Sequence, residues 1–231
     1  MESCTQREIK STESTKEKVI LIGNPNVGKS VIFNYLTGKY VTVSNYPGTT
    51  VEVSTGTMTA RGKKVQVLDT PGVNSLIPMS EDERVTRDIL LKESKNHLIQ
   101  VIDTKNIRRG LLISLQLLEM GLPFIVLLNM WDEAKSRGIE IKIQTLSERL
   151  GVPILKTVAT RKKGLEKIKE NLQDRPPSSI PINYSEAIER GISRITPFLP
   201  EAFISKRSLA LMLLSGDESL AEWLHNNLSE N

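Results

Sequence analysis

The chain has 231 residues, of which 39% are hydrophobic and 25% are charged, as is typical of a soluble globular protein with one full domain and a small second one. The formal net charge of +4 is too small to argue for nucleic acid as a partner, and the single cysteine excludes an internal disulfide and a cysteine-based metal cluster. No apolar run approaches the roughly 18 residues of a membrane span, and no signal peptide is visible.

Strand and helix patterns alternate along most of the chain, after a polar leader at residues 1–17 that we expect to be flexible. The patterns predict strands at residues 19–22, 53–60, 65–68, 98–102, 124–128 and 153–155. They predict helices at residues 29–36, 80–93, 107–120, 144–150 and 165–172. Ser80 and Glu83 have the spacing of a capping box. Strands separated by helices predict an α/β fold with a mainly parallel sheet, which one hairpin makes mixed.

The alternation ends at "DRPPSSIP", residues 174–181, whose prolines and serines predict a linker. Helical patterns follow at 184–195, 208–214 and 219–228, without a strand pattern. We therefore expect an α/β domain at 18–173, and a linker with a small all-helical domain at 174–231.

The stretch "GNPNVGKS" has the spacing of a phosphate-binding loop, and it follows a predicted strand and opens a predicted helix. Gly23 and Gly28 allow a tight turn that brings backbone N–H groups onto phosphate oxygens. Lys29 supplies a charge between the β- and γ-phosphates, and Ser30 supplies a hydroxyl for Mg²⁺. We expect the whole loop and the residue that follows it to surround the nucleotide: Gly23, Asn24, Pro25, Asn26, Val27, Gly28, Lys29, Ser30 and Val31.

Two further motifs follow predicted strands. In "DTPG", Asp69 can hold a magnesium-bound water and the Gly72 N–H can meet the γ-phosphate. In "NMWD", an ionised Asp132 accepts hydrogen bonds only, so it suits the adjacent N1–H and N2–H donors of guanine and not the N1 acceptor of adenine. We expect Asn129 to tie this loop to the phosphate-binding loop.

These stretches resemble the G1, G3 and G4 motifs of small GTPases, and "VAT" (Val158, Ala159 and Thr160) resembles G5. The usual G4 motif is N-K-x-D, and Met130 stands here in place of the lysine, so its alkyl stem can stack on the base without adding a charge.

A wider set of stretches resembles the cytoplasmic N-terminal region of the bacterial ferrous-iron transporter B (FeoB) family: "GNPNVGKS", "NYPGTTVE", "DTPGVNSL", "SEDERVTRDIL", "LLNMWDEA" and "GVPILKTVATRKKGLEKI". The resemblance implies a P-loop small-GTPase fold followed by a helical domain that slows nucleotide release. It implies that Thr50, in the G2 segment, binds Mg²⁺ together with Ser30 and, through water, Asp69. It also implies a K⁺ ion held partly by Asn26, which offsets charge developing on the phosphates because Val73 cannot orient the attacking water as a glutamine would.

The resemblance therefore predicts a slow, potassium-stimulated GTPase in which Asn26, Lys29, Thr50 and Gly72 serve catalysis. GTP and GDP are the expected ligands. The membrane channel domain of the same protein, oligomerisation in the membrane and a place on the cytoplasmic face of the bacterial inner membrane are also expected. That channel domain is not among these residues, so we expect a soluble fragment, with a stand-alone variant as the alternative. Two other functions stay open: an RNA- or ribosome-associated GTPase, and a nucleotide-binding module with negligible turnover.

Overall fold

The computed structural model describes residues 17–38, 41–60, 62–92, 96–172 and 182–228. The predicted leader, apart from residue 17, and the predicted linker lie outside the described residues, and so does the boundary between the two predicted domains.

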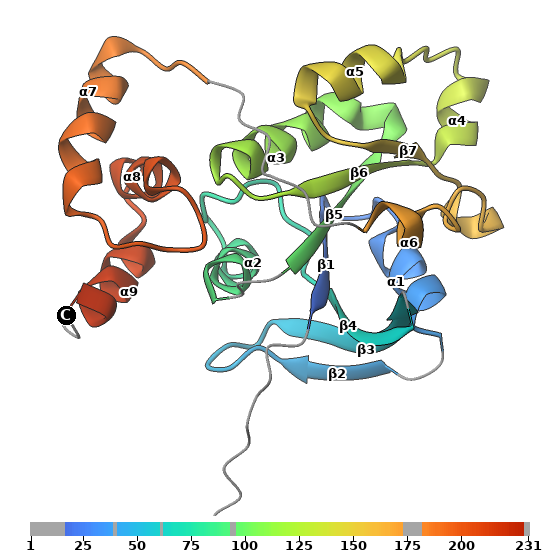
Figure 1. Ribbon diagram of the computed structural model, residues 1–231, viewed down its shortest axis with the longest axis horizontal. Coiled ribbons are helices and arrows are strands. Elements are labelled where there is room, and N and C mark those ends of the chain that lie inside the picture. The colour runs from blue at the N-terminus through green and yellow to red at the C-terminus, as the bar shows by residue number, and fades with distance from the viewer. Residues whose placement is uncertain (1–16, 39–40, 61, 93–95, 173–181, 229–231) are drawn as a thin grey trace, which may run out of the picture.

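A mixed sheet forms the centre of the larger domain (Figure 1). Its strands are β1 (Lys18–Gly23), β2 (Val41–Asn45), β3 (Glu52–Ala60), β4 (Lys63–Asp69), β5 (Asn96–Asp103), β6 (Phe124–Asn129) and β7 (Ile154–Lys156). They lie in the order β2-β3-β4-β1-β5-β6-β7. The pairs β2–β3 and β3–β4 are antiparallel and the other four pairs are parallel, which confirms the mixed, mainly parallel sheet. The predicted hairpin is β3–β4, and β2 adds a second antiparallel pair that was not predicted.

Helices cover both faces of the sheet, and short 3₁₀ turns join some of them. The helices are α1 (Lys29–Thr37), α2 (Glu81–Lys92), α3 (Ile107–Glu119), α4 (Trp131–Ser136), α5 (Ile143–Leu150), α6 (Ile168–Asn171), α7 (Glu186–Ile195), α8 (Lys206–Leu214) and α9 (Glu218–Leu228). The 3₁₀ turns are η1 (Thr104–Asn106), η2 (Ala159–Arg161) and η3 (Thr196–Phe198).

Alternate side chains of the buried strands divide the core between the two faces. Ile20 and Ile22 of β1 belong to the cluster that includes α2, α3, α5 and the helical domain. Val19 and Leu21, their neighbours in β1, belong to the cluster that includes α1 and α6. The sheet is therefore the middle layer of three, and the loops at the carboxyl ends of its parallel strands share one edge.

Three parts of the structure differ from the sequence expectation. Strand β2 was not predicted, because all five of its residues are exposed and no buried face marks it. The short helix α4 was also missed. The capping box is only half formed: the Glu83 N–H donates to Ser80 Oγ (3.3 Å), whereas the Glu83 carboxylate accepts N–H groups from the loop before α2.

The helical domain, α7–α9, packs against α2 and α3 (Figure 1). Leu209 and Leu220 of this domain belong to the same hydrophobic cluster as Leu90 of α2. Polar contacts with the end of α3 add to this interface: the Ser205 N–H donates to the Met120 carbonyl at 2.8 Å. The two parts therefore share one continuous core.

Candidate functional site

A cavity of about 610 Å³ lies where the loops after β1, β4, β6 and β7 meet. The predicted residues that line it are Asn24, Pro25, Asn26, Gly28, Lys29, Ser30, Val31, Gly72, Asn129, Met130, Asp132, Val158, Ala159 and Thr160. The predicted residues Gly23, Val27, Asp69 and Thr50 are not part of this lining. The fold thus brings together segments that lie more than one hundred residues apart in sequence, and the volume suits a small-molecule ligand.

The loop after β1 needs glycine where it meets its neighbours. Gly28 has φ +86°, and a Cβ atom built there would lie 2.4 Å from Asn129 Nδ2. A Cβ atom on Gly72 would lie 2.8 Å from Pro25 Cα. A larger residue at either position would push the loops apart, so both glycines are required for the close approach that shapes the cavity.

Lys29, Ser30 and Asp69 form one cluster beside the cavity. The Lys29 ammonium donates to the Asp69 carboxylate and to the Thr70 carbonyl. Ser30 Oγ donates to the other oxygen of Asp69 at 2.7 Å. A hydroxyl and a carboxylate side by side are oxygen ligands of the kind that Mg²⁺ accepts, so these residues fit a magnesium site.

Asn24 connects the loop after β1 to the loop after β4. Its side-chain amide donates to the Val73 carbonyl (3.0 Å) and to Asn74 Oδ1 (3.3 Å). Val73 itself is buried, with 1% of its surface exposed. A side chain in that position belongs to the core, so it leaves the orientation of an attacking water to other groups.

Asn129 connects the loop after β6 to the loops after β1 and β7. Its amide nitrogen donates to the Val27 carbonyl at 2.9 Å, which is the expected tie between the "NMWD" and phosphate-binding loops. Its amide oxygen accepts the N–H of Ala159 (2.9 Å) and the hydroxyl of Thr157 (3.3 Å). One buried side chain therefore fixes three loops relative to one another.

Asp132 lies in the first turn of α4 and lines the cavity. The preceding Met130 caps this helix in the left-handed region (φ 57°), which turns the chain sharply after β6. Asp132 Oδ1 accepts the N–H of Glu133 at 3.0 Å, and Oδ2 lies 3.5 Å from Arg161 Nη1. The carboxylate is thus held from two directions.

Thr50 and Asn26, the two residues assigned from the family resemblance, have different surroundings. Thr50 is exposed, and its hydroxyl donates to Glu81 Oε2 at 3.4 Å. Asn26 lines the cavity with φ 63°, a left-handed conformation that asparagine tolerates better than most residues. Its exposed carboxamide can offer an oxygen to a cation at the cavity.

Sequence reasoning missed two acidic residues of the cavity, Asp82 and Glu133. Asp82 lies in the first turn of α2, and Glu133 in the first turn of α4 beside Asp132. The number of residues between "DTPG" and Asp82 does not predict that Asp82 lines the cavity, because the conformation of the intervening loop sets its position.

Within the residues that the structure describes, no group of three or more His, Cys, Asp or Glu side chains could hold a metal ion. Across the same part of the chain, none of the helices has the length and apolar character needed to cross a bilayer.

Both parts of the chain are similar to known proteins of one family. Residues 17–172 match the family model described as ferrous iron transport protein B, and residues 184–231 match the FeoB cytosolic helical domain. The Fe(2+) transporter FeoB of Escherichia coli (strain K12) is 37% identical over 206 residues, which are 85% of this chain and 26% of that protein. A fusion of Fe(2+) transport protein A with FeoB from Porphyromonas gingivalis is 36% identical over 215 residues, covering 88% of this chain and 26% of the fusion. The chain therefore spans about a quarter of the length of these curated relatives.

Solved structures give the same match at the level of the fold. The cytosolic domain of the T. maritima FeoB iron transporter in a GDP form is 35% identical, with a TM-score of 0.82, and the match covers 91% of this chain and 86% of that one. The GMPPNP form of the same domain is 36% identical, also with a TM-score of 0.82, covering 90% of this chain and 85% of that one.

Proposed function

This chain belongs to the ferrous iron transport protein B (FeoB) family, and we propose that it is a domain that binds GTP and hydrolyses it slowly, as a regulatory switch for ferrous-iron transport. The observation that carries the proposal is the meeting of the four loops on one cavity, which is lined both by the phosphate-binding loop and by Asp132. Structures of relatives in GDP and GMPPNP forms support guanine nucleotides as the ligands.

The phosphates would lie on the loop after β1. Its backbone N–H groups and the start of α1 favour an anion, because the helix N-terminus carries a partial positive charge. Lys29 would exchange its contact with Asp69 for the β- and γ-phosphate oxygens. The N–H of Gly72, which lies against Pro25 of the loop after β1, would then meet the γ-phosphate.

The base would lie against Asp132. Its two carboxylate oxygens accept hydrogen bonds from guanine N1–H and N2–H, and adenine offers no such pair. Met130 and the backbone of Val158, Ala159 and Thr160 would surround the remaining edges of the base.

Magnesium would be held by Ser30 Oγ, by Thr50 Oγ1 in the triphosphate state, and through water by Asp69. When bound, Mg²⁺ neutralises part of the phosphate charge. Thr50 would have to leave Glu81 to reach this position, and its exposed location permits such a movement. Asn26 would supply one oxygen ligand of a potassium ion near the phosphates, a role that suits its place in the lining.

The link to iron is proposed from the family alone. The rest of the longer protein would form the membrane channel, and nucleotide turnover would time its opening. The helical domain would slow nucleotide release through its contacts with α2, the helix that follows the "DTPG" loop. Oligomerisation through the membrane part would be a property of the whole protein.

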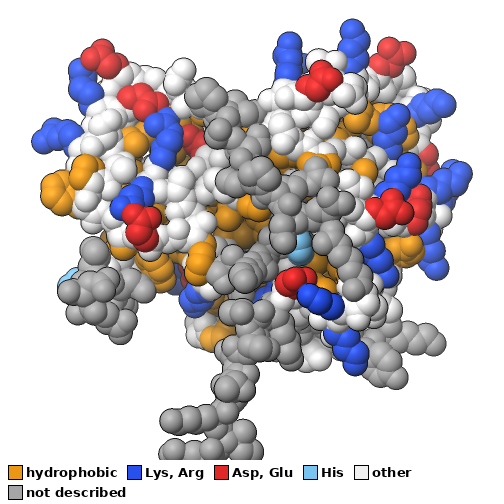
Figure 2. Space-filling model, in the orientation of Figure 1, with side chains coloured by type: hydrophobic (Ala, Val, Ile, Leu, Met, Phe, Trp, Pro, Cys, Tyr) orange, Lys and Arg blue, Asp and Glu red, His pale blue; other side chains and the backbone are white. Residues whose placement is uncertain are grey.

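The alternatives make different demands on the surface and on turnover. An RNA-associated GTPase would need a strongly basic face. Figure 2 shows Lys and Arg side chains interspersed with Asp and Glu on the face in view. A nucleotide-binding module without turnover would share the cavity, so only kinetics separate it from a GTPase.

Two measurements test the proposal. Isothermal titration should show GDP binding preferred over ADP by about 10⁴, because a site built on paired hydrogen bonds rejects the wrong base by that order. Asp132→Asn should bind XDP in preference to GDP. Phosphate release from GTP over several turnovers should then be detectable and magnesium-dependent. Equal affinity for GDP and ADP would contradict guanine recognition, and binding without phosphate release would leave the non-hydrolysing module as the function.

A further inference from the structure

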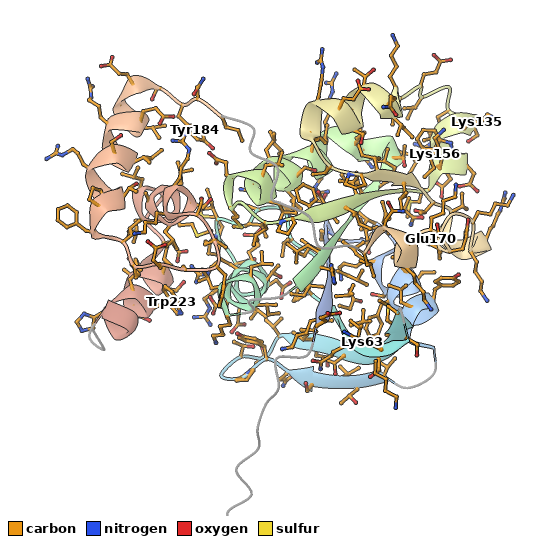
Figure 3. The ribbon with its side chains drawn as sticks, in the orientation of Figure 1. Lys63, Lys135, Lys156, Glu170, Tyr184 and Trp223 are labelled. Carbon is orange, nitrogen blue, oxygen red and sulfur yellow. The ribbon has the colours of Figure 1, made fainter. Side chains whose placement is uncertain are left out.

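The first three residues of α4 each meet a cation from a different element of the fold. The Lys156 ammonium, on β7 (Figure 3), lies 4.8 Å from the centroid of the Trp131 ring. Lys105, on η1, pairs with Glu133. Arg161, the last residue of η2, pairs with the residue between them, Asp132. Of these three cations, Arg161 is the one that contacts Asp132, the residue that we propose to select guanine.

Arg161 is positioned by a closed turn. Its N–H donates to the Val158 carbonyl at 3.0 Å, and Val158 and Lys163 form an antiparallel bridge. The same turn is hydrogen-bonded to the buried Asn129 through the N–H of Ala159. The backbone that carries Arg161 is therefore fixed to the floor of the cavity, although the Arg161 side chain is 65% exposed.

The charge of Arg161 matters because Met130 brings none. Among the ion pairs of the described residues, the one made by Asp132 is with Arg161. Each carboxylate oxygen has two acceptor positions, so an oxygen that already receives an N–H can accept a second donor from the base. The Glu133 N–H on Oδ1 and Arg161 near Oδ2 therefore leave each oxygen with a second acceptor position for a donor of the base.

We propose that Arg161 is a positioning residue for guanine recognition: its guanidinium holds the outer side of the Asp132 carboxylate so that both oxygens face the base. The inference rests on the proposed recognition of guanine by Asp132. Arg161 need not touch the nucleotide. It fixes the rotation of the carboxylate that does, and it supplies near the base the positive charge that Met130 lacks.

The test compares Arg161→Gln with Lys162→Gln in the 231-residue chain. Both changes remove one positive charge from adjacent exposed positions of the same turn, but only Arg161 pairs with Asp132. Calorimetric titration with GDP should show an affinity loss of about three- to fivefold for Arg161→Gln, the size of an exposed ion pair, and less than about 1.5-fold for Lys162→Gln. Arg161→Lys, which keeps the charge, should stay within about twofold of the wild type.

Two further measurements separate positioning from a general effect on the loop. IDP lacks the N2 amine and can use only one oxygen of Asp132, so Arg161→Gln should reduce GDP affinity more than IDP affinity. In the Asp132→Asn background, adding Arg161→Gln should change XDP affinity less than twofold. Equal losses for GDP and IDP, or equal behaviour of the two glutamine variants, would overturn the inference. A wild-type chain that fails to prefer GDP over ADP would overturn the proposed function instead.

Discussion

Arg87 of α2 forms a buried ion pair with Asp217, the residue that precedes α9. The two side chains are 1% and 3% exposed. Arg87 also donates to Ser219 Oγ at 2.8 Å, and Asp217 Oδ1 accepts the Leu220 N–H at 3.0 Å, so the aspartate caps α9 as well. This cluster joins the helix after the "DTPG" loop to the helical domain.

Removing the Arg87 guanidinium should therefore be costly. We expect Arg87→Met to lower the free energy of unfolding by about 3–5 kcal/mol, because it leaves Asp217 as an uncompensated buried charge. Arg84→Met is the matched control: Arg84 lies on the same helix, and its 3.7 Å pair with Glu81 is exposed, so its loss should cost at most about 1 kcal/mol. Urea unfolding of both variants measures the difference, and similar midpoints would mean that the buried pair contributes little to stability.

The two adjacent threonines of the G2 segment should behave differently. Thr49 is committed to the local turn, since its hydroxyl donates to the Tyr46 carbonyl (3.0 Å) and accepts the Val51 N–H (3.2 Å). Thr50 is exposed and makes one long contact with Glu81. We expect Thr50→Ala to weaken magnesium-dependent GMPPNP binding and to leave GDP binding nearly unchanged, because a γ-phosphate and Mg²⁺ together order such loops.

Thr49→Ala should act mainly on the stability of the turn. Titrations of both variants with GMPPNP and GDP, with and without Mg²⁺, measure the difference. If Thr49→Ala were the damaging change and Thr50→Ala silent, the assignment of the magnesium ligand in this segment would be wrong.

The parts of the fold with a buried face could be predicted from the sequence. Strand β6 is buried along its whole length and appears as an unbroken apolar run, and the motif loops follow such strands directly. Strand β2, exposed throughout, has no such signal. The motifs likewise indicated most of the cavity, because each has a fixed spacing from its own strand.

The contacts that could not be predicted from the sequence are tertiary ones. Glu83 looked like one half of a capping box, but its buried carboxylate accepts the N–H groups of Asn74, Ser75 and Met79 and holds the loop before α2. No local pattern encodes a contact of that kind. The same holds for Arg161 and Asp132, which are 29 residues apart in sequence and meet only because β6 and β7 are neighbours.

The contact between α7 and α8 should make stability depend on acid pH. The Arg207 guanidinium, hydrogen-bonded to the Glu189 carboxylate, lowers the pKa of Glu189 to about 2. Because the folded pKa lies below the unfolded value of about 4.3, the stabilisation is complete above that value and is lost as the pH falls toward 2. Glu189→Gln should therefore be less stable than the wild type at pH 6, and the difference should shrink by pH 3.

Glu186→Gln is the control for that series, since Glu186 makes an exposed pair with Arg190 on the same helix and should have little effect at either pH. Thermal unfolding at several pH values measures all three proteins. A difference between Glu189→Gln and the wild type that stays constant from pH 6 to pH 3 would contradict the assignment. The neighbouring Tyr184 stays neutral throughout this pH range, because burial and Glu119 raise its pKa to about 12.

The last prediction concerns Asn26 and the rate of hydrolysis. With the buried Val73 in place of a water-orienting glutamine, intrinsic turnover should be on the order of 10⁻⁴ to 10⁻³ s⁻¹. Potassium should raise it and sodium should not, since oxygen ligands spaced for K⁺ coordinate the smaller ion poorly. The effect should appear in kcat more than in nucleotide affinity, because the ion would stabilise charge that grows in the transition state.

Asn26→Ala should abolish the potassium response and leave GDP binding mostly intact. Phosphate release at matched ionic strength in KCl and NaCl decides the matter: equal rates in the two salts would remove the cation mechanism and require another group at the cavity, such as Asp82, to assist the reaction.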